Sequence, residues 1–237
     1  MVTDPAAESL FDAAAHRFAP AGRFARHYAR GKLGGDPVFA ELLRRGLIPD
    51  GARLLDLGCG QGILLVLLVA ARELHAAGVW PAGWPPPPGW LALRGIDFFA
   101  KDVGRAQRAL GDDAAVELGD LRNAPLPPSD VIVLIDVLQY LEPAAQESLL
   151  ARIAQALAPQ GLLLTRVGDP AAGFAAALTW VVDQVVAVAR GQGLQRLYRR
   201  SIAAWTAALE RHGLAAAVAP MNDDTPFANV LLVARKR

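Results

Sequence analysis

Leu54-Leu-Asp-Leu-Gly-Cys-Gly-Gln-Gly62 is the stretch of the chain that decides its fold. An apolar run is interrupted by one acidic residue, Asp56, and three glycines follow at alternate positions before a second apolar run begins. Glycine permits tight turns and lets a ligand approach the backbone closely, because no Cβ is in the way. The stretch therefore predicts a buried strand, a glycine-rich loop that binds a ligand, and a helix.

The spacing of the glycines narrows the choice of ligand. Glycines at 58, 60 and 62 give G-x-G-x-G, whereas the dinucleotide fingerprint needs a third glycine where Ile63 stands. No lysine follows the loop, as a phosphate-binding P-loop would require. Asp56 would repel a pyrophosphate but suits a ligand with an ammonium group. The pattern therefore favours a cationic ligand without phosphate.

From residue 53 onward, short apolar runs alternate with amphipathic stretches, which is typical of a parallel sheet covered on both faces by helices. We expect strands at residues 53–57, 93–97, 115–118, 130–135, 162–167, 215–219 and 230–234. Helices are expected at 63–77, 101–110, 143–157 and 202–212, the last two ended by Gly161 and Gly213.

The predicted fold is α/β, with a doubly wound, seven-stranded, mostly parallel sheet and an antiparallel last strand. The last two strands follow one another without a helix, so they should pair antiparallel at the sheet edge. Residues 1–36 are expected to form an N-terminal helical cap, and residues 37–237 a Rossmann-like domain.

Residues 80–90, rich in proline and tryptophan, should form a stiff extended loop, because proline fits neither a helix interior nor an inner strand. A connection from a helix to the next strand lies at the N-terminal edge of the sheet, whereas ligands bind at the opposite edge. We therefore expect surface packing or a partner contact at this loop.

Residues 169–200 follow the fifth strand and begin at the ligand-binding edge of the sheet. We expect a helical lid insertion there, although a helix that simply adds to the core fits the same pattern. Residues 171–189 are almost wholly apolar and close to the length of a membrane span. Asp183 and Gln184 near their middle oppose burial in lipid, which favours a buried or substrate-facing helix.

Composition limits the kind of protein. The chain has 237 residues, 53% of them hydrophobic, and a formal net charge of +1. Such a chain buries a substantial core and has no global basic field, which weakens DNA or large RNA as a substrate without excluding tRNA. The single cysteine, Cys59, fits a reducing cytoplasm, and the first thirty residues hold no apolar run suited to a signal peptide. No metal site is predicted.

The stretch from Leu54 to Gly62 resembles the first motif of the class I S-adenosylmethionine-dependent methyltransferases, and the resemblance runs over residues 37–237. It implies S-adenosyl-L-methionine as the cofactor. The cofactor residues that it implies are Asp56, Gly58, Cys59 and Gly60 for the methionine moiety, Asp97 for the ribose hydroxyls with Phe98 after it, and Asp120 and Leu121 for the adenine.

The resemblance also implies which residues surround the reacting methyl group. Asp136 and Val137 follow the fourth strand and would lie beneath the methionine part of the cofactor. Gln139 stands where relatives often carry histidine, so an obvious general base is missing and proton removal must come from elsewhere or be unnecessary.

In many relatives the segment before the first strand folds over the cofactor. His27 or Tyr28 would then face the substrate, and Arg30 or Lys32 would meet the methionine carboxylate. Tyr140 and His27 are the candidate catalytic residues, which would orient the acceptor. The candidate substrate residues are Tyr28, Gln139, Arg166, Phe174 and Trp180, of which Arg166 would pair with a carboxylate substrate or with Asp169.

The predicted reaction is methyl transfer to the oxygen, nitrogen or carbon of a small hydrophobic or aromatic acceptor, free or held by a carrier protein, in bacterial secondary metabolism. A non-catalytic methyltransferase-like binding module fits the same residues. An NAD(P)-dependent oxidoreductase shares the layout, but the chain lacks its glycine fingerprint and a Tyr-x-x-x-Lys motif. A tRNA or protein methyltransferase would favour a broader basic face or an aromatic-proline tetrad.

Overall fold

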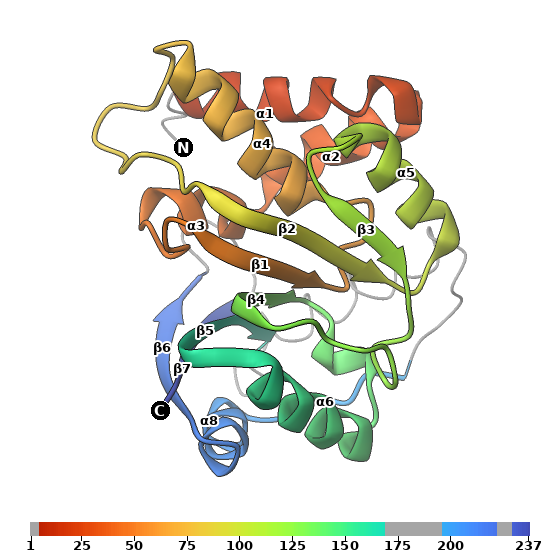
Figure 1. Cartoon of the computed structure of the whole chain (residues 1–237), viewed down its shortest axis with the longest axis vertical. Helices are drawn as coiled ribbons and strands as arrows, with labels where there is room; N and C mark the ends of the chain where they lie inside the picture. Colours follow the sequence, from red (N-terminus) through yellow and green to blue (C-terminus); the bar gives the residue numbers. More distant parts are fainter. Residues whose placement is uncertain (1–4, 169–195, 222–228) are drawn as a thin grey trace. The chain divides into compact units, whose positions relative to one another are not determined.

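The computed structural model describes residues 5–168, 196–221 and 229–237. Seven strands form one sheet in the order β3-β2-β1-β4-β5-β7-β6 (Figure 1). The contacts of the chain divide it into two compact units, Met1–Val131 and Ile132–Arg237.

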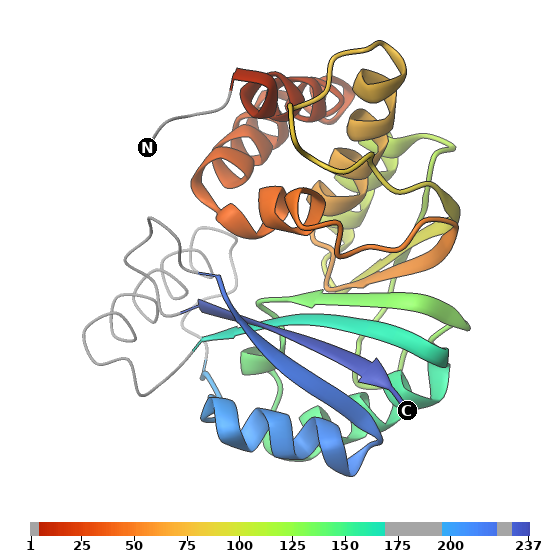
Figure 2. The same ribbon diagram turned by 90° about the vertical axis from the view of Figure 1, so that its left-hand side faces the viewer.

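The first unit begins with three helices, α1 (Pro5–His16), α2 (Arg23–Gly35) and α3 (Pro37–Arg44). Asp36 caps α3, because its side chain accepts a hydrogen bond from the Val38 N–H, and Pro37 suits the first helical position. Helix α1 packs against α2 and α4 (Figure 2). The N-terminal residues are thus helical, while a domain boundary at residues 36 and 37 stays a prediction.

The sheet of the first unit consists of β1 (Ala52–Leu57), β2 (Trp90–Asp97) and β3 (Ala115–Leu118), which pair in parallel. Helix α4 (Ile63–Ala76) follows β1, and α5 (Ala100–Leu110) follows β2. The first nine residues of α4 are all apolar and all buried, so this helix forms part of the core on more than one face.

The proline-rich loop closes at the N-terminal ends of β1 and β2, and Trp90, the last residue of the expected loop, is the first residue of β2. The Gly51 N–H donates to the Gly89 carbonyl at 3.0 Å, and the Gly89 N–H donates to the Asp50 carboxylate at 2.6 Å. Within the loop, the Trp80 indole N–H donates to the Pro85 carbonyl at 3.0 Å. The Asp50 and Trp80 contacts fix the loop at the edge of the sheet away from the glycine motif.

The second unit contains η2 (Leu138–Tyr140), α6 (Pro143–Ala156), β5 (Leu157–Gly168), α8 (Ile202–Arg211), β6 (Leu214–Pro220) and β7 (Asn229–Lys236), and β4 (Ser129–Ile135) crosses the boundary between the units. Strand β7 lies between β5 and β6 and runs antiparallel to both (Figure 2). The expected antiparallel pairing of the last two strands is therefore confirmed.

All seven expected strands and four expected helices are present, with their ends shifted by a few residues. Gly213 follows α8 with a φ of 75°, as expected of a glycine that ends a helix. The prediction for Gly161 was wrong, because α6 ends at Ala156 and Gly161 lies within β5. Gln160 takes the left-handed conformation instead, with a φ of 61°.

The predicted lid insertion of residues 169–200 lies largely outside the described residues, and so do Phe174 and Trp180. In the described ranges, no helix is long and apolar enough to cross a membrane.

Candidate cofactor and acceptor site

The glycine loop after β1 requires its glycines. Gly58, Gly60 and Gly62 have φ values of 71°, 56° and 79°, in the left-handed region that favours glycine. A Cβ at Gly62 would also lie 3.1 Å from the Cβ of Ala106 on α5. The loop therefore keeps a conformation that other residues would strain, and α4 begins close against α5.

Three successive N–H groups of this loop donate to the end of β2. The N–H groups of Gly58 and Cys59 donate to the Ile96 carbonyl at 2.8 Å and 3.2 Å, and the Gly60 N–H donates to Oδ2 of Asp97 at 2.8 Å. Oδ1 of Asp97 accepts from the Phe99 N–H at 2.9 Å. Asp97 is buried and joins the glycine loop to the start of α5.

Asp56, at the end of β1, is a buried carboxyl group. Burial, with the nearby charge of Asp97 as a smaller cause, raises the pKa of Asp56 to about 7. In the part of the chain that the structure describes, no donor bonds to its carboxylate and no cation pairs with it. A buried carboxylate in this state is stabilised by a positively charged ligand.

Cys59 contributes its backbone rather than its thiol. A Cβ at Gly95 would lie 2.8 Å from Sγ of Cys59, so the thiol occupies the space that Gly95 leaves in β2. Burial, followed by the charges of Asp56 and Asp97, raises the pKa of the thiol well above its usual range. The thiol is therefore neutral and packed into the core.

Asp120 and Leu121 follow β3 in a turn that is attached to β2. The Gly119 N–H donates to the Asp97 carbonyl at 2.9 Å, and a Cβ at Gly119 would lie 3.0 Å from the Ile96 side chain. Asp120 accepts from the Arg122 N–H and also pairs with the Arg122 guanidinium at 3.2 Å. The structure thus brings the turn at Asp120 to the end of β2.

Phe98 lies between Asp97 and α5 and is 57% exposed, with its ring edge-on to Phe99 at 5.4 Å between centroids. A large aromatic ring this exposed, next to a buried carboxylate, is available to stack on a planar ligand.

The candidate residues on α2 have different surroundings. Arg30 pairs with Glu8 and Asp12 of α1, and Lys32 pairs with Asp36 at 2.6 Å. Both cations therefore already have carboxylate partners. His27 is exposed, whereas Tyr28 is half-buried and stacks on Phe24 at 6.1 Å between ring centroids.

Gln61 is a residue of this site that the sequence analysis did not single out. Its side-chain N–H donates to the Ala25 carbonyl of α2 at 2.9 Å. This bond brings the glycine loop and α2 together, although they are 36 positions apart in the chain. A glutamine between two glycines carries no pattern that would reveal such a contact.

In the second unit, Asp136 directly after β4 has a φ of 58°, which is uncommon outside glycine. Its carboxylate pairs with the guanidinium of Arg166 through two bonds, one of them from Nε at 2.8 Å. Arg166 is 2% exposed and lies near the end of β5. The sequence predicts a carboxylate substrate or Asp169 as the partner of Arg166. Asp169 lies outside the described residues, and the pairing with Asp136 was not predicted.

Gln139 and Tyr140 lie in η2, which a second unforeseen glutamine holds in place. The buried amide of Gln146 donates to the carbonyls of Leu138 and Tyr198, both at 2.9 Å, and accepts from Arg200 at 2.7 Å. The Tyr198 N–H donates in turn to the Gln139 carbonyl at 2.7 Å. Val137, Gln139 and Tyr140 are half-buried.

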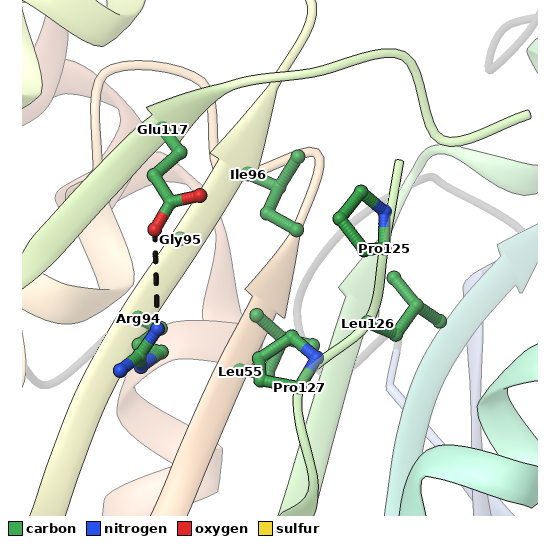
Figure 3. Close-up of a pocket in the computed structure, with 8 residues that line it drawn as sticks. All are labelled: Leu55, Arg94, Gly95, Ile96, Glu117, Pro125, Leu126 and Pro127. Carbon is green, nitrogen blue, oxygen red and sulfur yellow. Dashed lines mark ion pairs between the residues drawn. The ribbon is translucent and has the colours of Figure 1, made fainter. Parts of the chain in front are cut away.

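A separate pocket of about 180 Å³ lies in the first unit (Figure 3). Leu55, Ile96 and residues 125–127 form its apolar lining, and Arg94 faces Glu117 across 3.9 Å at its rim. None of the predicted cofactor or substrate residues lines this pocket.

A family model described as "Methyltransferase domain" matches residues 25–217. The chain belongs to this family. The resemblance to the methyltransferases is therefore confirmed.

Curated methyltransferase-family relatives match about half of the chain. The carboxy-S-adenosyl-L-methionine synthase of Chromohalobacter salexigens is 32% identical over 54% of this chain and 46% of its own length. The trans-aconitate 2-methyltransferase of Methylobacterium nodulans is 36% identical over 55% of this chain and 43% of its own length. The chain thus spans about half the length of these relatives.

Among solved structures, the magnesium protoporphyrin IX methyltransferase of Synechocystis with bound S-adenosylhomocysteine is similar, with a TM-score of 0.57 and 21% identity. The similarity covers 91% of this chain and 88% of that chain. At this level of identity it shows that the two proteins share a fold.

The residues present fit the cofactor of the family. The left-handed glycines leave the loop free of side chains, so that a ligand can approach its backbone. Asp56 offers a buried carboxylate, and its carboxylate lacks a cation among the described residues, which suits the ammonium and sulfonium charges. Asp97 offers a carboxylate, the kind of group that accepts from both hydroxyls of a diol.

Proposed function

We propose that the protein transfers the methyl group of S-adenosyl-L-methionine to a small acceptor molecule. The observation that carries this proposal is the buried carboxylate of Asp56 beside a glycine loop that Asp97 holds in place. A nicotinamide dinucleotide would bring phosphate charge to this carboxylate, whereas S-adenosylmethionine brings positive charge.

Each cofactor residue then has a distinct task. Asp56 and the loop backbone bind the methionine end, Asp97 accepts from the ribose hydroxyls, and the turn at Asp120 and Leu121 receives the adenine. Phe98 stacks on the adenine with its exposed ring. The family resemblance also assigns Asp136 and Val137 to the methionine end. Arg30 and Lys32 serve the methionine carboxylate only when they give up part of their present ion pairs.

S-adenosylmethionine supplies an electrophilic methyl group on a good leaving thioether when it is bound. The protein mainly has to hold the acceptor in line with that group, and such positioning lowers a barrier by up to about 7–11 kcal/mol. Tyr140 and His27 orient the acceptor in this proposal, and Tyr28, Gln139 and Arg166 contribute to its binding.

The acceptor class rests on two kinds of support. The relative from Methylobacterium nodulans is named for trans-aconitate, a small carboxylate, which supports a small-molecule acceptor. The apolar residues 171–189, together with Phe174 and Trp180, favour a hydrophobic or aromatic body. The acceptor that fits both kinds of support is a small aromatic molecule. It is free or held by a carrier protein, and we place the reaction in the cytoplasm of a bacterium.

The test is turnover with S-adenosylmethionine and a panel of phenols, aromatic acids and aliphatic carboxylic acids. We expect S-adenosylhomocysteine and a product heavier by one methyl group, detected by mass spectrometry, with aromatic members preferred. The Asp97→Ala variant should lose both signals together. Tight binding of S-adenosylhomocysteine without turnover of any panel member or of co-purified material would favour a non-catalytic binding module.

A further inference from the structure

Gln61 connects the glycine loop to helix α2 through a buried amide. The residue is 1% exposed, and its Nε2 donates to the Ala25 carbonyl at 2.9 Å. Its Oε1 is also buried and has no hydrogen-bond partner within the described ranges. A buried polar atom without a partner is rare in folded proteins, so the position of this amide calls for a physical reason.

Helix α2 is also held, beside Ala25, by a side chain of α5. The guanidinium of Arg105 lies 4.8 Å from the ring centroid of Phe24, and its Nη1 donates to Oδ1 of Asp102 at 3.0 Å. Helix α5 follows directly on Asp97 and Phe98, which belong to the proposed cofactor site. The first turn of α2 thus contacts the glycine loop, through Gln61, and the helix that follows Asp97 and Phe98, through Arg105.

The candidate acceptor residues of α2 lie on the next positions of the same helix. His27 and Tyr28 follow Ala25 by two and three residues. Any shift of the helix at Ala25 therefore moves both side chains, because a helix of this length moves as a rigid element.

We propose that Gln61 is a positioning residue that couples cofactor binding at the glycine loop to the docking of α2. A cofactor that orders the loop also fixes the backbone of Gln61. It thereby favours the hydrogen bond from the Gln61 amide to the Ala25 carbonyl. Docked α2 in turn stabilises the binding conformation of the loop, because such coupling is reciprocal. The inference rests on the proposed cofactor site but not on the identity of the acceptor.

The experiment uses the full chain with S-adenosylhomocysteine as the probe. Gln61→Met keeps the length of the side chain and removes both polar atoms. Gln107→Met is the control for loss of an amide-to-carbonyl bond elsewhere in the unit, since Nε2 of the exposed Gln107 donates to the Val116 carbonyl at 2.8 Å. Calorimetry gives the Kd, and hydrogen exchange followed by mass spectrometry reports on residues 23–35.

In the unaltered chain, we expect S-adenosylhomocysteine to slow exchange across α2 at least tenfold. In Gln61→Met, the ligand should still bind, with a Kd raised about three- to tenfold, but the protection of α2 should disappear. Gln107→Met should keep both the Kd and the protection. A purely structural role of Gln61 would lower thermal stability equally with and without ligand, whereas coupling reduces the increase in Tm that the ligand causes.

Protection of α2 that persists in Gln61→Met would overturn the inference and leave the proposed cofactor site standing. Ligand binding without any protection of α2 in the unaltered chain would overturn it too, even if the variant fails to fold. Absence of S-adenosylhomocysteine binding to the unaltered chain would refute the proposed function itself, and this inference with it.

Discussion

The backbone N–H of Gly60 donates a hydrogen bond of 2.8 Å to the carboxylate of Asp97, which ties the glycine loop after β1 to the end of β2. The second oxygen of the same carboxylate accepts from the Phe99 N–H at 2.9 Å. Two backbone donors thus fix the carboxylate that we propose to accept from the ribose hydroxyls.

Asp97→Ala should weaken binding of S-adenosylhomocysteine by at least tenfold. The substitution removes the proposed bonds to the ribose, each worth roughly 1.5–3 kcal/mol for a charged acceptor, and it also frees the Gly60 N–H. Isothermal titration calorimetry measures the change. An unchanged Kd in a folded variant would show that Asp97 holds the loop and does not contact the ligand.

Asp50 offers the matched control at the opposite ends of the same strands. Its carboxylate also accepts from the N–H of a glycine, Gly89, at 2.6 Å. Asp50 is exposed, so Asp50→Ala should lower stability less than Asp97→Ala does, and it should leave the Kd for S-adenosylhomocysteine unchanged.

The pKa of Asp56 predicts how stability depends on pH. Folding raises this pKa from 3.8 to about 7, mainly through burial. The folded state therefore holds the proton more tightly than the unfolded chain does, and this contribution to stability is lost as pH rises from about 4 to about 7. The free energy of unfolding of Asp56→Asn should therefore rise, relative to that of the unaltered chain, by up to about 4 kcal/mol over this range. Urea unfolding at several pH values measures the difference, and a constant difference would show that Asp56 ionises normally.

The same carboxyl group should release a proton when a cationic ligand binds. At about pH 6 most of the Asp56 carboxyl is protonated in the free protein, and an ammonium group favours the ionised form. Calorimetry in buffers of different ionisation enthalpy should therefore show nearly one proton released per S-adenosylhomocysteine at about pH 6 and fewer at about pH 8. Asp56→Asn should show no such buffer dependence.

The buried pair of Arg166 and Asp136 should respond unequally to single and double substitution. Asp136→Ala removes one carboxylate partner of a 2% exposed guanidinium and puts alanine at a φ of 58°, so it should cost up to roughly 3–5 kcal/mol. Asp136→Asn combined with Arg166→Met removes both charges, and asparagine tolerates the left-handed conformation. The double variant should be more stable than Asp136→Ala in urea unfolding. Equal losses of unfolding free energy in Asp136→Ala and in the double variant would mean that the charge pair does not control stability here.

Much of the fold was predictable because the apolar runs are short and regularly interrupted. The glycines at 58, 60 and 62 marked the loop, and counting apolar runs placed Asp97 at a strand end, where the structure has it. Pairing of the last two strands followed from the missing helix between them. Boundaries were harder, since Gln160 and not Gly161 adopts the left-handed conformation before β5 becomes regular.

The contacts between distant segments were not predictable from pattern. The amide of Gln61 reaches Ala25, and the amide of Gln146 joins Leu138 to Tyr198. Such bonds depend on which elements the fold brings within about 3 Å of each other, and a single sequence does not encode that distance in its periodicity. The ion pairs of Arg30 with Glu8 and Asp12 of α1 were not predictable for the same reason.

The central claim is that the glycine loop and the carboxylates of Asp56 and Asp97 bind S-adenosylmethionine and not a dinucleotide. The most direct test is a pair of calorimetric titrations of the unaltered chain, one with S-adenosylhomocysteine and one with NAD. We expect S-adenosylhomocysteine to bind with a Kd in the micromolar range, which corresponds to a binding free energy of about −8 kcal/mol, and to raise the Tm. NAD should do neither. A titration in which NAD binds and S-adenosylhomocysteine gives no signal would contradict the account.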